Sequence, residues 1–130
     1  MNILNLLFKR SFQKPKVLNG TDRDLVRHRW ANIEQLAGAK SPSALKQAII
    51  EADKLLEFAL KKLINENQPL GENLKLAQGL FPSYATYQQA WEAHKVRNAL
   101  VHEAGYEPTH SLAKDTINKF KIVLQTLRAL

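Results

Sequence analysis

The sequence predicts an all-α protein, an up-and-down bundle of four long helices plus one short helix. Apolar residues recur three to four positions apart in five stretches, and no stretch has the pattern of a strand. Long amphipathic helices joined by short connections favour an antiparallel bundle. The 130 residues are enough for one hydrophobic core but not for two, so we expect a single globular domain.

The first two helices are predicted over residues 21–36 and 42–65. Thr21 is suited to cap the first helix, and Gly38 stops it. Ser41-Pro42 starts the second, because a proline in the first helical turn loses no backbone hydrogen bond. Apolar side chains share one face of each helix: Leu25, Val26, Trp30, Ile33 and Leu36 in the first, and Leu45, Ala48, Ile49, Ala52, Leu55, Leu56, Ala59, Leu60 and Leu63 in the second.

The remaining helices are predicted over residues 69–77, 84–103 and 110–129. Ser83 opens the long helix 84–103, and Gly105 ends it. Pro108 and Thr109 lead into the last helix. We expect the last helix to turn one apolar set inward: Leu112, Ile117, Phe120, Val123, Leu124 and Leu127.

Positive charge is concentrated near the N-terminus. The net charge is +7, and residues 1–29 hold seven Lys or Arg against two Asp. Such a cluster attracts phosphate backbones or an anionic membrane surface, and a solvated, solubilising face is the alternative. Under the first reading, Arg23, Arg27 and Arg29 are the candidate RNA-binding residues.

Residues 1–20 form a predicted apolar and basic tail with its linker, ahead of the bundle predicted over 21–130. The apolar part of residues 1–12 is too short to span a bilayer, but it permits a weak contact with a membrane surface. A frayed end or a contact with a partner chain is the alternative. The chain has no cysteine, which excludes disulfides, thiolate zinc sites and a cysteine nucleophile and fits a cytoplasmic location.

One residue breaks the pattern of the helix 84–103. Arg97 stands among the apolar positions of this helix. A guanidinium in such surroundings is costly unless it is paired or opens onto a polar cavity. We therefore interpret Arg97 as functional, with a structural arginine that caps a buried carboxylate as the alternative. The apolar side is marked by Ala90, Ala93, Val96, Leu100 and Val101.

Two further polar residues follow Arg97. Asn98 and His102 are four positions apart, so they share one side of the helix, and an Asn amide there can set the tautomer of an imidazole. Arg97 and His102 are about 140° apart around the helix axis. RNA cleavage by its own 2′-hydroxyl needs an acid, a base and a cation for the phosphate, which imidazole and guanidinium groups supply. A two-fold dimer through this helix would bring two of each into one cleft.

The run Arg97-Asn98-Ala99-Leu100-Val101-His102 resembles the signature of HEPN domains: Arg, a polar residue, then His after four to six intervening positions. These domains are small helical bundles, and many are metal-independent endoribonucleases that act as dimers, including toxins and antiviral effectors. The resemblance implies that Arg97 and His102 are catalytic and that Asn98 orients them. It also implies RNA as substrate and, for toxins, an antitoxin-like partner. It covers about residues 21–130.

Supporting residues are predicted around this motif. An acidic group often steadies the arginine in such sites; Asp53 is the first candidate and Glu51 the second, with a surface carboxylate near Lys54 as the alternative for each. His94 assists catalysis or is a half-exposed filler, and Tyr106 lines the cleft or packs on the last helix. The tyrosines and tryptophan of the helix 84–103 stack on bases or pack against neighbouring helices: Tyr84, Tyr87 and Trp91.

Two other functions compete with the nuclease. One is a non-catalytic HEPN-like module that binds a nucleotide or a partner protein, and the other is a plain helical interaction domain. We expect no metal, because the histidines lack ligand spacing and the adjacent His102 and Glu103 point in different directions. We expect no cofactor either.

Overall fold

The computed structural model describes residues 16–130, and all regular structure in this part of the chain is helical. The prediction of an all-α helical bundle is confirmed for these residues. The predicted tail contact of residues 1–12 lies outside them. Five α-helices and one 3₁₀ turn follow one another: α2 (Gly20–Gly38), α3 (Pro42–Ile64), α4 (Leu70–Leu76), η1 (Gln78–Leu80), α5 (Tyr84–His102) and α6 (His110–Thr126).

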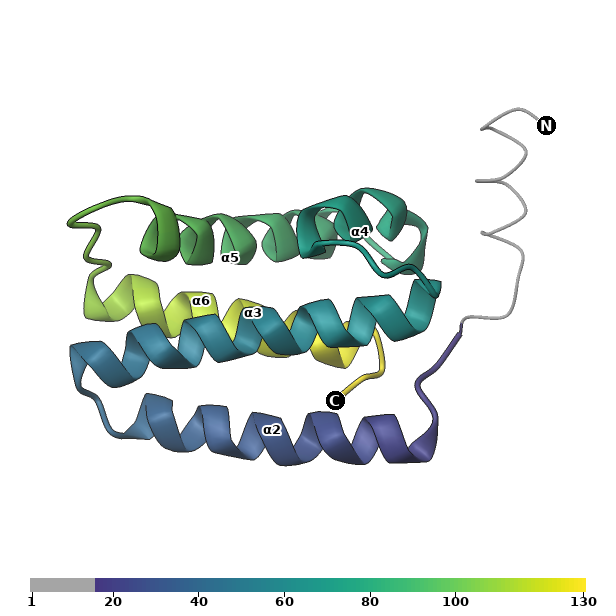
Figure 1. Ribbon diagram of the computed structural model, residues 1–130, viewed down its shortest axis with the longest axis horizontal. Coiled ribbons are helices and arrows are strands. Elements are labelled where there is room, and N and C mark those ends of the chain that lie inside the picture. The colour runs from purple at the N-terminus through teal and green to yellow at the C-terminus, as the bar shows by residue number, and fades with distance from the viewer. Residues whose placement is uncertain (1–15) are drawn as a thin grey trace.

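The helices α2, α3, α5 and α6 lie side by side and alternate in direction along the chain (Figure 1). α3 contacts α2, α4, α5 and α6 and is therefore the central helix. The short α4 lies beside the N-terminal half of α5, and the two form the upper layer in Figure 1. α2 lies at the opposite edge, with α3 and α6 between it and α5.

Side-chain caps fix where the helices begin. The hydroxyl oxygens of Ser41, Ser83 and Thr109 each accept a hydrogen bond from a backbone N–H in the first turn of α3, α5 and α6. The predicted cap of the first helix was wrong. Asn19 takes this role: its Oδ1 lies 2.8 Å from the backbone N of Asp22, and α2 begins one residue before Thr21.

The core is built around α3, whose buried side chains face all its neighbours. Its apolar face matches the predicted set, since all nine residues of that set are buried. The last helix follows its pattern less closely. Leu112 was predicted to face inward, but it is 36% exposed because it sits in the first turn of α6, at the open end of the bundle. The other five residues predicted to face inward are buried.

Polar contacts hold the connections near α5. Lys119 of α6 lies 2.9 Å from Glu92 of α5, and the hydrogen bond from this carboxylate raises the pKa of the Lys119 ammonium. An ion pair between Lys46 and Glu107 ties the start of α3 to the loop after α5. Between residues 16 and 130, no helix is long and apolar enough to cross a bilayer.

Asn73 fastens the loop between α3 and α4. Its Nδ2 donates to the backbone oxygens of Glu66 and Gln68, at 3.0 and 3.3 Å, and its side chain is fully buried. We expect Asn73→Ala to lower the free energy of unfolding by about 1–2 kcal/mol, because two backbone carbonyl groups lose their hydrogen-bond donor. Urea denaturation measures this, with Asn67→Ala in the same loop as the exposed control. Equal stabilities of the two variants would contradict this role.

Candidate functional site

Arg97 is anchored to a buried carboxylate of the central helix. Its Nε and Nη2 both lie 2.8 Å from Oδ1 of Asp53. The Asp53 side chain is 1% exposed and that of Arg97 is 21% exposed. The guanidinium therefore spans from the core edge to the surface. Asp53, the first candidate for the acidic partner, has this position because α3 and α5 pack against each other.

His94 binds the other oxygen of the same carboxylate. Its Nδ1 lies 2.7 Å from Oδ2 of Asp53, and only 8% of its side chain is exposed. The alternative of a half-exposed filler is therefore wrong for His94, and the surface alternative is wrong for Asp53. Each carboxylate oxygen of Asp53 has a partner on α5: Oδ1 pairs with Arg97, and Oδ2 pairs with His94. This matches the rule that a buried carboxylate is paired and hydrogen-bonded.

Asn98 completes a chain of four side chains. Its Nδ2 lies 3.3 Å from Nε2 of His94. A neutral imidazole with its proton on Nδ1 donates to Asp53 and accepts from Asn98, so this tautomer satisfies both neighbours. Sequence reasoning had placed Asn98 against His102. The amide instead turns one helical turn back, towards the N-terminus of α5.

The network has a sequence signal that the motif alone does not contain. His94, Arg97 and Asn98 stand at i, i+3 and i+4, so one side of α5 presents all three to α3 and its surroundings. Gly71 of α4 covers this place. A Cβ added there would lie 3.7 Å from Nε2 of His94 and 3.9 Å from Trp91, which is ordinary van der Waals contact. α4 thus lies against the His94 end of the network.

The C-terminal turn of α5 is open to solvent. His102 is the last residue of the helix and is exposed, and it makes no side-chain hydrogen bond or ion pair within residues 16–130. Val101, predicted on the apolar side, is 51% exposed. Tyr106 is half-buried in the following loop. Within one chain, Arg97 points inward and His102 outward.

Glu51 does not belong to this site. Its Oε1 lies 2.8 Å from Nε2 of Gln47 and 3.7 Å from Nζ of Lys54, all on α3. It also lines a groove of about 430 Å³ between α2 and α3. The two carboxylates are two residues apart on α3, about 200° around the helix, so only Asp53 faces α5.

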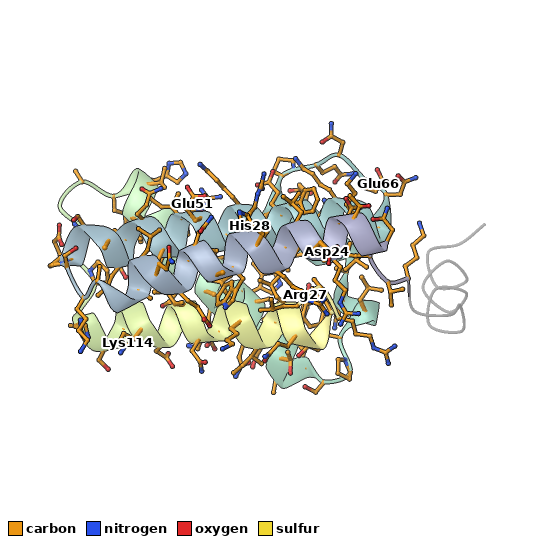
Figure 2. All side chains as sticks on the ribbon, turned by 90° about the horizontal axis from the view of Figure 1, so that it is seen from below. Asp24, Arg27, His28, Glu51, Glu66 and Lys114 are labelled. Atoms are coloured by element: carbon orange, nitrogen blue, oxygen red, sulfur yellow. The ribbon has the colours of Figure 1, made fainter. Side chains whose placement is uncertain are left out.

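The three arginines predicted to bind RNA lie on α2, across the bundle from α5 (Figure 1). In Figure 2, α2 faces the viewer, and Arg27 lies near Asp24, with 3.9 Å between Nη1 and Oδ1. Arg29 is stacked over the ring of Phe58, 5.8 Å from its centre. Arg23 is partly buried. These side chains are therefore not brought together with Arg97 and His102 in one chain.

No group of three or more His, Asp or Glu side chains between residues 16 and 130 is arranged to hold a metal ion. The chain matches no protein-family model, no curated protein and no solved structure. The geometry around Asp53 and the exposed end of α5 therefore carry the functional argument by themselves.

Proposed function

We propose that this protein is a metal-independent endoribonuclease of the HEPN type, with its helices arranged as a HEPN-like bundle of four long helices and one short one. It acts as a homodimer in which the C-terminal turns of two α5 helices meet. Its biological setting is that of a toxin, a defence factor or an RNA-processing enzyme. The observation that carries the proposal is a half-buried arginine fixed by a buried carboxylate, on the same helix as an exposed histidine five residues later.

The way Asp53 holds Arg97 supports a role in phosphate binding. The carboxylate takes the Nε and Nη2 side of the guanidinium, so Nη1 has no partner among residues 16–130. A guanidinium held on one side presents its other N–H groups in a fixed direction. Such pre-oriented donors stabilise the negative charge that grows on the non-bridging phosphate oxygens during cleavage.

His102 supplies the proton transfer. One imidazole accepts the proton of the 2′-hydroxyl, whose oxygen forms a bond to phosphorus while the bond from phosphorus to the 5′-oxygen breaks. A second imidazole donates a proton to the departing 5′-oxygen. The products are a 2′,3′-cyclic phosphate and a free 5′-hydroxyl. Two such groups require two chains, and the exposed turn with Val101 and His102 provides an uncovered surface for a second copy.

The direct test is incubation of the purified protein with mixed single-stranded and structured RNA in the presence of a chelator. We expect cleavage that leaves 2′,3′-cyclic phosphate ends, identified by mass spectrometry. Arg97→Lys keeps the charge but loses the planar fork on Asp53, so we expect it to cut at least about tenfold more slowly. Intact RNA with wild-type protein, or full activity of Arg97→Lys, would overturn the proposal.

A non-catalytic HEPN-like module is the second candidate, because Asp53 is fully occupied within one chain, as in a structural network. It predicts tight binding of a nucleotide or a partner protein, such as an antitoxin, without turnover. Calorimetric titration with nucleotides, run beside the cleavage assay, separates the two functions. Binding without any product favours the module.

A further inference from the structure

One line of side chains runs along the outer side of α5 and ends at His102. Tyr84 and His102 are eighteen residues apart, which is five turns of about 3.6 residues, so they point in the same direction from the axis. Four residues between them fall within about 40° of that direction. We call this set the α5 line: Tyr84, Gln88, Trp91, Lys95, Asn98 and His102.

Four of the six residues of the α5 line are exposed to solvent. Tyr84, Gln88, Lys95 and His102 are exposed, and Trp91 and Asn98 are half-buried. Tyr84 is 64% exposed, although a tyrosine ring is usually covered. The buried residues of α5 begin beside the line and continue to the opposite side of the helix: Tyr87 and His94 lie about 60° and 80° from the direction of Tyr84, and Ala90 and Ala93 lie further round. In Figure 1, α5 belongs to the upper layer, and α4 lies beside its N-terminal half.

The chemistry of the α5 line fits a polyanion with flat bases. It contains two aromatic side chains, one lysine and one histidine, but no carboxylate and no aliphatic side chain. The nearest carboxylate on α5 towards α6 is Glu92, which is paired with Lys119 at 2.9 Å. Aromatic rings stack on bases without regard to sequence, and a lysine one turn beyond Trp91 can neutralise a backbone phosphate.

The ring of Trp91 is held in a fixed orientation. It packs edge-on against Tyr87 and His94, with ring centres 6.4 and 6.2 Å apart. Through His94 it adjoins the carboxylate that anchors Arg97. A base stacked on Trp91 would therefore lie against the network that orients the guanidinium.

We propose that the α5 line is the binding track for the single-stranded part of an RNA substrate, which runs from Tyr84 to the reacting phosphate beside His102. This inference rests on the proposed function for the position of the reacting phosphate alone. The track is about 27 Å long, from eighteen residues at about 1.5 Å rise each. At about 3.4 Å per nucleotide in a stacked strand, it accommodates about eight nucleotides.

Binding of fluorescein-labelled oligouridine tests the track without cleavage. The background is His102→Ala, which removes the proposed proton donor, and the readout is fluorescence anisotropy. We expect affinity to rise from four to eight nucleotides and to change little from eight to twelve. Adding Tyr84→Ala should weaken binding of the 8-mer about tenfold, because one stacked base is lost, whereas Tyr84→Phe should retain the affinity.

Lys95 has a separate readout. Lys95→Gln should lower the slope of log Kd against log salt concentration by about 0.7, because one phosphate contact is lost. Lys114→Ala, an exposed lysine on α6 (Figure 2), is the matched control and should leave the slope unchanged. Equal slopes for Lys95→Gln and its background would overturn the track.

Three outcomes separate this inference from others. If Tyr84→Ala dissociates a dimer in sedimentation but leaves the affinity per dimer unchanged, the α5 line is a subunit interface and the track is wrong. If the wild-type protein cuts no RNA but binding still depends on Tyr84 and Lys95, the nuclease proposal fails and the track stands. If the wild-type protein cleaves RNA but adding Tyr84→Ala leaves the affinity of the background variant unchanged, the nuclease proposal stands and the track is wrong.

Discussion

Replacing His102 by alanine should abolish RNA cleavage without changing the stability of the fold. General acid–base catalysis contributes about 10²- to 10⁴-fold, and both imidazoles of the proposed dimer are removed together, so we expect a loss of at least about 10³-fold in kcat. The side chain is exposed and makes no contact with a polar partner within residues 16–130, so the Tm should stay the same. Cleavage of a labelled RNA and thermal denaturation measure the two effects.

His28→Ala is the matched control, because His28 is also an exposed helical histidine but lies on α2, across the bundle (Figure 2). It should retain full activity. Retained activity in His102→Ala would rule out the proton transfer assigned to this residue. A wild-type protein that is fully active as a monomer would contradict the shared cleft, because one chain supplies only one His102.

The helices could be predicted closely from the sequence, because their limits depend on local chemistry. α3 and α5 begin at the predicted residues, because the hydroxyl groups of Ser41 and Ser83 each accept a hydrogen bond from the backbone N–H three residues later. The one wrong prediction of a capping residue, at the start of α2, also has a local cause. Asn19 and Thr21 both have a suitable side chain, and Gly20 between them allows the helix to start from the earlier one.

The contacts of the site could be predicted only in part, because they depend on packing between helices. Helical periodicity alone does not say which carboxylate of α3 faces α5, and Asp53 is distinguished from Glu51 only once the two helices are packed. The role of His94 was underestimated for the same reason. Spacing on α5 shows that His94 and Arg97 share a side, but the carboxylate between them comes from a residue 41 positions earlier.

The exposed end of α5 shows a second limit of prediction from the sequence. Val101 has the spacing of a core residue, yet half of it is exposed. A residue of this kind is ambiguous in the sequence, because apolar periodicity does not distinguish the core of one chain from the contact surface between two. The oligomeric state of the protein in solution decides between these two readings of Val101.

Replacing Asp53 by alanine should produce the largest loss of stability of any substitution proposed for this protein. Removing one partner of a buried ion pair costs about 3–5 kcal/mol, because the other charge stays buried without compensation. Here the single carboxylate serves both Arg97 and His94, at 2.8 and 2.7 Å. We expect the free energy of unfolding to fall by about 4 kcal/mol, measured by urea denaturation. Glu51→Ala should change it by less than about 0.5 kcal/mol.

Replacing three charged or polar side chains of the network by apolar ones separates the contribution of the network to stability from its contribution to function. Buried ion pairs exchanged for well-packed apolar groups of similar volume are often as stable as the original. We therefore expect Asp53→Leu with Arg97→Met and His94→Leu to recover most of the stability lost in Asp53→Ala. The same triple variant should cut no RNA, because the fixed guanidinium is gone. If the triple variant stays as unstable as Asp53→Ala, the network is required by the fold itself. Stability alone would then explain why these polar side chains are buried, without a role in function.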